Sequence, residues 1–159
     1  MLVLAKEKSA SAIGSSRSNN TFSIPFLEAD ALRLPFAGCS FDLVTAAFGF
    51  RNLANYEAGL REIHRVLKPG GMLAILEFTE PPPGLLGDLY RFYFRRVLPR
   101  IGSLLSGDRS AYTYLPASVS RFFGPAELAS LMSSVGYSDV DFCVWSLGAV
   151  ALHTGRRVI

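Results

Sequence analysis

Residues 41–78 decide the fold, and they read FDLVTAAFGFRNLANYEAGLREIHRVLKPGGMLAILEF. The first ten form a continuous apolar run, which is typical of a central parallel strand with both faces covered. Residues 55–67 place apolar side chains at helical spacing, and the KPGG at 68–71 is predicted to end that helix. Residues 72–78 form a second unbroken strand. A strand, a helix and a strand with short links indicate a parallel sheet flanked by helices, an α/β fold.

The same patterns predict further helices and strands on either side of this unit. They are a helix over 1–13 that starts at Met1 without an N-cap, a strand over 21–29 ending near Asp30, a helix-period segment over 85–105 that Pro99 ends or kinks, a helix over 124–136, and strands over 137–147 and 148–157. A glycine-containing link joins the last two strands, so we expect an antiparallel hairpin at an edge of the sheet.

Composition limits the classes of protein to consider. The 159 residues suit one domain, and half of them are hydrophobic, with a mean hydropathy of +0.29. This apolar excess predicts an apolar partner or a missing piece of the domain. The net charge of +3 permits contact with anionic lipid or nucleic acid without requiring either. No nucleic-acid recognition motif is present, so we expect no nucleic-acid partner.

The two cysteines and the lack of a long apolar run indicate the compartment. Cys39 and Cys143 are far apart and belong to no metal-ligand motif, which predicts neither a zinc site nor a disulfide framework. No apolar run reaches the roughly 18 residues of a membrane span, and the N-terminus lacks a signal-peptide core. We therefore expect a cytoplasmic protein, with contact at the inner face of the membrane left open.

Arg51 directly follows the apolar run 41–50, and its charge needs an explanation. An unpaired guanidinium taken out of water costs several kcal/mol, so the position requires either a built-in partner or a ligand. In parallel α/β sheets, ligands bind outside the carboxyl ends of the strands. We therefore predict a site where three such ends converge, although any one of these residues alone reads equally well as an ordinary loop polar group. The residues at the three ends are Glu28, Asp30 and Ala31; Phe48, Gly49, Arg51 and Asn52; and Glu77, Phe78 and Thr79.

Four stretches carry a resemblance to a known family: ADALRLPF at 29–36, FDLVTAAFGFRNL at 41–53, IHRVLKPGGMLAILEF at 63–78, and VLPRIGSLLSGDRSAYTYLPASV at 97–119. Together they resemble the quinone C-methyltransferases. This family comprises demethylmenaquinone methyltransferases and 2-methoxy-6-polyprenyl-1,4-benzoquinol methylases, which use S-adenosyl-L-methionine. The resemblance runs from Met1 to about Arg156. It implies a class I methyltransferase sheet, which is Rossmann-like, with a C-terminal antiparallel hairpin and a helical insertion at about 84–117.

The chain departs from that family in the part that grips the cofactor. Class I methyltransferases carry a glycine-rich loop after their first strand and an acidic residue ending the second, and this chain contains no G-x-G. Residues 1–10 resemble the helix that follows the second strand. The expectation is therefore a partial domain, 1–159, that lacks the first strands as a fragment or through a late start. A rebuilt cofactor site in a shortened protein is the alternative.

The resemblance also implies roles for individual residues. Arg51 does not deprotonate, so it would hold a water molecule or stabilise a phenolate, with Asn52 orienting it. Tyr112 or Tyr114 would reach the other ring oxygen, unless these tyrosines serve core packing. Asp30, which could instead be a turn residue, would accept from the adenine amine. The other cofactor-side residues are Ala31, Ala47 and Phe48.

The implied reaction is C-methylation of a polyprenyl hydroquinone, with demethylmenaquinol preferred over a benzoquinol. The alternatives are another small aromatic substrate and a non-catalytic quinone-binding or scaffold subunit. The segment 85–105 would cover the site and offer an apolar channel for the isoprenoid tail. Its arginines also suit an anionic membrane surface, while an ordinary amphipathic core helix is equally consistent with it. A homo-oligomer stays open, His64 is expected on a solvated helix face, and His153 is expected to pack at a sheet edge.

Overall fold

The computed structural model describes residues 25–81, 84–92 and 118–158, and the chain divides into two compact units, Met1–Asp30 and Ala31–Ile159. In the first unit the described residues, 25–30, form neither helix nor strand. The strand predicted over 21–29 is therefore wrong for its described part, where Pro25 has no amide hydrogen to give to a ladder. The helix predicted over 1–13 lies outside the described residues.

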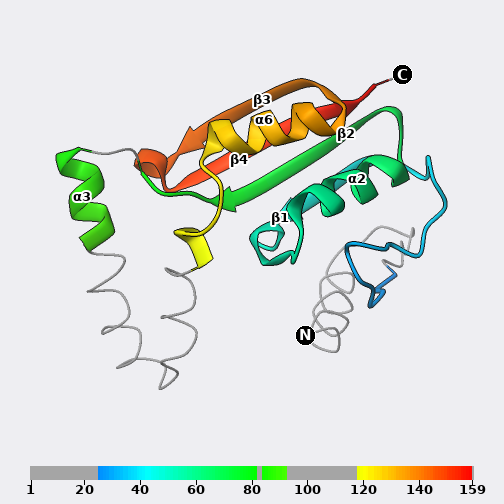
Figure 1. Cartoon of the computed structure of the whole chain (residues 1–159), viewed down its shortest axis with the longest axis horizontal. Coiled ribbons are helices and arrows are strands. Elements are labelled where there is room, and N and C mark those ends of the chain that lie inside the picture. Colours follow the sequence, from blue (N-terminus) through cyan, green and yellow to red (C-terminus); the bar gives the residue numbers. More distant parts are fainter. Residues whose placement is uncertain (1–24, 82–83, 93–117, 159) are drawn as a thin grey trace, which may run out of the picture. The chain divides into compact units, whose positions relative to one another are not determined.

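The second unit contains the strand, helix and strand that the sequence predicts, followed by the C-terminal hairpin (Figure 1). Its helices and strands are β1 (Phe41–Ala47), η1 (Phe50–Asn52), α2 (Tyr56–Val66), β2 (Leu67–Phe78), α3 (Leu85–Phe92), α6 (Pro125–Val135), β3 (Tyr137–Trp145), η3 (Ser146–Gly148) and β4 (Val150–Arg157). Of the segment predicted over 85–105, the described part is α3; Pro99 lies outside the described residues.

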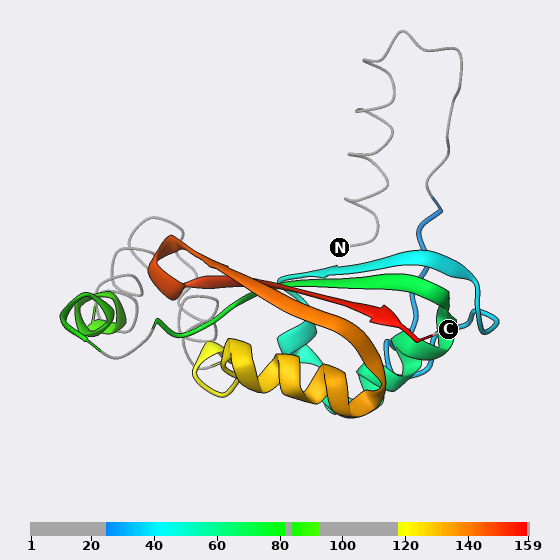
Figure 2. The ribbon, with the colours of Figure 1, turned by 90° about the horizontal axis from the view of Figure 1, so that it is seen from above.

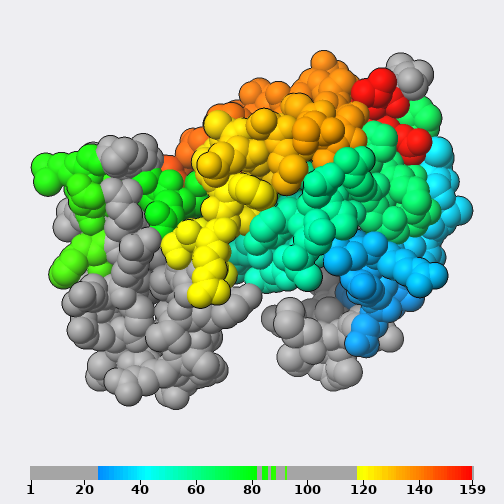
Figure 3. Space-filling view, viewed as in Figure 1, coloured from blue at the N-terminus to red at the C-terminus, as the bar shows by residue number. Residues whose placement is uncertain are grey.

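The described strands form one mixed sheet in the order β1-β2-β4-β3. β1 and β2 are parallel, and β4 runs antiparallel to both β2 and β3, so β3 is the edge strand of the predicted hairpin. Helices α2 and α6 cover the same face of this sheet, as Figure 2 shows, and they lie next to one another on the surface seen in Figure 3. The core lies between these helices and the sheet, and its fully buried members include Leu60, Leu73, Ile75, Leu128 and Met132.

β1 is not the central strand with two covered faces that its apolar run predicts. It is an edge strand of the described sheet. Val44 and Ala46 pack against the core, whereas Leu43, Thr45 and Ala47 on the other face are exposed. The periodicity of a sequence shows what a strand is able to bury, and it does not show whether a partner lies over the second face.

The KPGG segment follows the end of α2 as predicted, but it belongs to β2, because the chain passes directly from α2 into the strand at Leu67. Gly70 has a φ of +76°, in the left-handed region that glycine tolerates. A Cβ on Gly71 would lie only 2.8 Å from the Lys68 carbonyl oxygen and 3.1 Å from that of Phe41. Gly70 therefore serves the left-handed turn, and Gly71 serves the close approach of β1 to β2, next to the register shift in their pairing.

Side chains close the two ends of α2. The Asn55 carboxamide oxygen accepts from the amide of Ala58 at 3.0 Å, which is an ordinary N-cap. At the other end, Nη1 of Arg157 on β4 lies 3.1 Å from the carbonyl oxygens of both His64 and Arg65. A cation at a helix C-terminus satisfies free carbonyl groups and complements the helix dipole. Arg157 on β4 thus fixes where α2 ends.

Candidate active site at the carboxyl ends of β1 and β2

The parallel pairing of β1 and β2 brings their carboxyl ends together. Ala47 lies opposite Leu76, and the amide of Phe48 donates to the Leu76 carbonyl at 2.8 Å. The turn η1 follows at once and places Arg51 beside Glu77, the residue after Leu76. The predicted convergence is therefore present for two strand ends. The third, at Glu28 and Asp30, is wrong because those residues form no strand.

Arg51 and Glu77 form a buried ion pair. Arg51 Nη1 lies 2.5 Å from Glu77 Oε1, and the two side chains are 8% and 1% exposed. The second carboxylate oxygen of Glu77 accepts from the Arg51 amide at 3.2 Å, and Oε1 also accepts from the amide of Phe78 at 2.9 Å. Hydrogen bonds of this kind compensate the desolvation of both charges. Of the two possibilities open from the sequence, a partner or a ligand, the structure shows a partner.

Further contacts hold the guanidinium in one orientation. Nη1 also donates to the Phe48 carbonyl at 2.7 Å, and Nε donates to the Ser118 hydroxyl at 3.3 Å. The Phe78 ring lies under the guanidinium, with 5.5 Å between its centroid and Cζ. The Tyr56 hydroxyl donates to the Arg51 carbonyl at 3.0 Å and so fixes the turn itself. Within the described part of the chain, Nη2 has no hydrogen-bond partner, which leaves it able to donate to a ligand oxygen.

The other predicted site residues differ in whether and where the structure describes them. Asn52 lies exposed in η1, where its backbone amide donates to the Gly49 carbonyl at 3.1 Å. Ala47 and Phe48 are exposed at the end of β1, and the Phe48 ring lies 4.6 Å from the Phe78 ring. Asp30 is exposed and belongs to the other compact unit. Ala31, the other predicted adenine contact, is exposed. Tyr112 and Tyr114 lie outside the described residues.

Two residues of this site, Glu77 and Ser118, have no role predicted from the sequence. Glu77 was noted only as a strand end, although an acidic residue closing an unbroken apolar strand is itself a signal, because a buried carboxylate needs a cation. Ser118 carries no such signal, since a serine contact made across 67 residues depends entirely on the tertiary fold.

Both histidine side chains are less accessible to solvent than the sequence predicts. His153 is 2% exposed on β4, inside the sheet and not at its edge, and its Nε2–H donates to the Pro125 carbonyl at 2.9 Å. Burial lowers its pKa below the ordinary value. His64 packs edge-on against Tyr137 instead of facing solvent, and burial, followed by the charge of Arg157, lowers its pKa. Both rings are therefore neutral in the folded protein near neutral pH.

We expect the free energy of unfolding to fall as the pH drops below about 6.5, the ordinary histidine value. Above that pH the two histidine side chains are neutral in both the folded and the unfolded chain. Below it the unfolded chain takes up protons that the folded chain refuses, which costs up to about 1.4 kcal/mol per pH unit for each histidine. The substitution His153→Gln keeps a donor for the Pro125 carbonyl but cannot titrate, so it should make the decline shallower. Urea unfolding followed by circular dichroism between about pH 7.5 and 5.5 measures this slope. If the free energy of unfolding of His153→Gln fell with pH as steeply as that of the unchanged chain, His153 would not be a cause of the decline. The substitution His64→Gln gives the same test for His64.

A family model described as the ubiE/COQ5 methyltransferase family matches residues 1–157. The chain belongs to this family. The resemblance noted in the sequence is thereby confirmed, and Arg51 and Glu77 lie in a member of the ubiE/COQ5 methyltransferases.

Individual relatives support the assignment. A demethylmenaquinone methyltransferase of Thermus thermophilus is 49% identical and covers 99% of this chain, which spans 67% of that protein. A demethylmenaquinone methyltransferase of Deinococcus radiodurans is 52% identical over 86% of this chain, which spans 54% of that protein. A ubiquinone/menaquinone biosynthesis C-methyltransferase of Idiomarina loihiensis is 40% identical over 84% of this chain and 53% of its own length. The chain thus spans between about half and two thirds of the relatives it matches.

Solved structures confirm the α/β class I methyltransferase fold at low sequence identity. A SAM-dependent methyltransferase from Aquifex aeolicus superposes with a TM-score of 0.63 at 18% identity, over 99% of this chain and 64% of that one. The [4+2]-cyclase SpnF superposes at 0.55 with 18% identity, over 99% of this chain and 63% of that one. A cyclase with this fold shows that the fold alone does not fix the reaction. In the described residues, no acidic or histidine cluster is placed to hold a metal, and no helix is both long and apolar enough to span a bilayer.

Proposed function

We propose that this chain acts in the S-adenosyl-L-methionine-dependent C-methylation of a polyprenyl hydroquinone, with demethylmenaquinol as the substrate. The observation that carries the proposal is the buried Arg51–Glu77 pair at the carboxyl ends of β1 and β2, in a chain of the ubiE/COQ5 family. Two relatives that are 49% and 52% identical over the matched residues are named demethylmenaquinone methyltransferases, which favours the naphthoquinol over a benzoquinol.

Arg51 would act on the oxygen of the hydroquinone ring. Methylation of a ring carbon needs negative charge on the neighbouring hydroxyl oxygen, because loss of that proton pushes electron density onto the carbon. A guanidinium does not act as a base, but its free Nη2–H groups can stabilise the phenolate or orient the water that accepts the proton. Glu77 holds the guanidinium in place, and its burial keeps competing water away from it.

S-adenosyl-L-methionine would supply an electrophilic methyl group. The described residues suit only the adenine end of this cofactor. The small exposed Ala47 and the partly exposed Phe48 ring offer a flat apolar surface at the end of β1, as an adenine requires. Phe48 also adopts a φ of +54°, an uncommon conformation for a bulky residue. The resemblance also implies that Asp30 and Ala31 contact the adenine, and for these two residues the contact stays a prediction. For the methionine and ribose parts the chain offers no glycine-rich loop, since it contains no G-x-G.

The substrate's tail adds contact with the membrane to the proposal. Polyprenyl quinols are held in bilayers, and α3 exposes Leu85 and Phe92 at the start of the segment 85–105. We propose that this segment touches the inner membrane surface from the cytoplasm. The rest of the segment, including Arg95, Arg96 and Arg100, lies outside the described residues.

Calorimetric titration with S-adenosyl-L-methionine tests the proposal. The titration compares this chain with the same chain joined to the part of the Thermus thermophilus relative that it does not match. We expect the joined protein to bind the cofactor and to methylate demethylmenaquinol. Faster methylation of the demethylated benzoquinol would make that benzoquinol the substrate in place of demethylmenaquinol. Cofactor binding without methylation of either quinol would indicate another aromatic substrate. Absence of cofactor binding in both this chain and the joined protein would indicate a scaffold protein.

A further inference from the structure

Thr79, the residue that follows the end of β2, carries a buried hydroxyl group for which the described part of the chain offers no hydrogen-bond partner. The residue is only 5% exposed. A hydroxyl taken out of water without a partner destabilises the fold, and buried polar side chains in native proteins are nearly always hydrogen-bonded. An apolar side chain of the same shape would fill the position without this cost. The hydroxyl therefore calls for a ligand.

The backbone holds this hydroxyl in a fixed place. The Thr79 amide donates to the Ala149 carbonyl at 3.0 Å, which continues the register in which Glu77 lies opposite Ala151. The β-branched side chain of threonine also has few rotamers, so it loses little conformational freedom when a ligand binds. A hydroxyl held in this way suits the placement of one particular ligand atom.

Thr79 lies on the same face of the chain as Glu77. Residues two apart on an extended backbone point the same way, and these two are 5% and 1% exposed. The residues opposite them on β4, Ala149 and Ala151, are buried and contribute only methyl groups to this face. Two residues of strand span about 6.6 Å. The Cα atoms of Thr79 and Glu77 are therefore separated by little more than the length of one aromatic ring.

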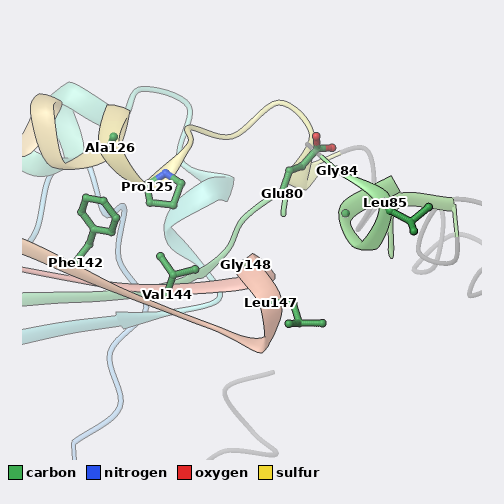
Figure 4. Close-up of a pocket in the computed structure, with 10 residues that line it drawn as sticks. Glu80, Gly84, Leu85, Pro125, Ala126, Phe142, Val144, Leu147 and Gly148 are labelled. Atoms are coloured by element: carbon green, nitrogen blue, oxygen red, sulfur yellow. The ribbon is translucent and has the colours of Figure 1, made fainter. Parts of the chain in front are cut away.

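An apolar pocket lies beside Thr79, between the start of α3, the first turn of α6 and the β3–β4 hairpin, but it does not supply the partner. Figure 4 shows this pocket, and its walls include Glu80 and Pro125. Thr79 is not among the described residues that line it, in keeping with the alternation of side chains along an extended chain. The hydroxyl thus belongs to the side of the strand end where Glu77 holds Arg51.

We propose that the Thr79 hydroxyl binds the second oxygen of the hydroquinone ring, the one para to the oxygen at Arg51. A 1,4-hydroquinone carries an oxygen at each end of one ring, and a threonine hydroxyl is able to donate to such an oxygen or accept from it. The inference rests on the proposed function, which supplies the hydroquinone and places its first oxygen at Arg51. It makes Thr79 a residue that selects ring diols over phenols with one hydroxyl, a role the resemblance gives to Tyr112 or Tyr114.

Titration calorimetry of this chain with two naphthols, under anaerobic and reducing conditions, tests the proposal. The probes are 1,4-naphthalenediol, which has both oxygens and no isoprenoid tail, and 1-naphthol, which has one oxygen. We expect the diol to bind at least about fivefold tighter, because it gains one neutral hydrogen bond. Thr79→Val should reduce the affinity for the diol to that for 1-naphthol. The affinity for 1-naphthol itself should not change, because its hydroxyl pairs with the charged Arg51, the stronger donor.

The thermal midpoint of the chain without ligand shows whether the hydroxyl has a structural role instead. Thr79→Val removes an unpaired buried hydroxyl, so it should raise the midpoint by about 2–4 °C in scanning calorimetry. Thr79→Ser keeps the hydroxyl and should retain most of the preference for the diol. Thr45→Val makes the same change at an exposed position of β1 and should alter neither the midpoint nor the affinity for either naphthol.

Failure of the inference and failure of the proposed function give different results. If Thr79→Val kept the preference for the diol, another residue would hold the second oxygen, and the proposed function would stand. Equal affinity of the unchanged chain for the two naphthols, or a lower thermal midpoint in Thr79→Val, would likewise overturn the inference alone. If neither naphthol bound, the hydroquinone site itself would be contradicted, and the inference would fall with the proposed function.

Discussion

Replacing Glu77 with leucine should lower the free energy of unfolding by about 3–5 kcal/mol, the usual cost of leaving a buried charge without its partner. Glu77 is 1% exposed and accepts hydrogen bonds from the Arg51 side chain, the Arg51 amide and the Phe78 amide. Leucine removes all of these acceptors and leaves the guanidinium in apolar surroundings. Urea unfolding of the chain, followed by circular dichroism, measures the loss.

A double-mutant cycle shows whether the loss comes from the ion pair. Arg51→Met combined with Glu77→Leu removes both charges, and it should recover most of the stability lost in Glu77→Leu alone. Glu57→Leu is the matched control, because Glu57 pairs with Arg61 on α2 with side chains 54% and 60% exposed. An exposed pair of this kind contributes about 1 kcal/mol or less. Additive losses in the cycle, or equal losses in Glu77→Leu and Glu57→Leu, would contradict the buried pair as the cause.

The sequence predicted the need for a partner of Arg51 but not the partner itself. The apolar run before Arg51 indicates burial, and burial requires compensation of the charge. Identifying Glu77 also requires the register of two strands, which sets Ala47 opposite Leu76. Register depends on contacts across the sheet, and periodicity along the chain does not encode it.

The errors in the predicted fold have the same origin. KPGG contains strong local signals for the end of a helix, and α2 does end before it, but the strand begins without a loop. A Cβ on Gly71 would crowd the carbonyl oxygens of Lys68 and of Phe41 in β1, so the start of β2 depends on a contact across the sheet. Local sequence correctly predicted α2, α6 and the hairpin, because their signals are internal to each element. The exposed face of β1 was missed because burial of a strand depends on what packs over it.

Arg51→Lys should lower the turnover of demethylmenaquinol by about 10²–10³-fold in the joined protein, the usual effect of removing one donor that stabilises developing negative charge. Lysine keeps the positive charge and can still pair with Glu77. It lacks the planar fork that lets arginine contact Glu77, the Phe48 carbonyl and Ser118 and still present Nη2 to a substrate oxygen. Initial methylation rates at saturating cofactor measure the change in turnover.

The affinity for S-adenosyl-L-methionine decides whether this loss is catalytic. An interaction made only in the transition state lowers turnover and leaves ground-state binding nearly intact, so the cofactor dissociation constant should change by less than about threefold. Arg61→Lys, at an exposed position of α2 away from the β1 and β2 strand ends, should change neither quantity. If turnover and cofactor affinity fell together, or if unfolding lost its cooperativity, Arg51 would be a structural residue. The Arg51–Glu77 pair would then serve to hold η1 against the end of β2, and the oxygen of the hydroquinone would need another partner.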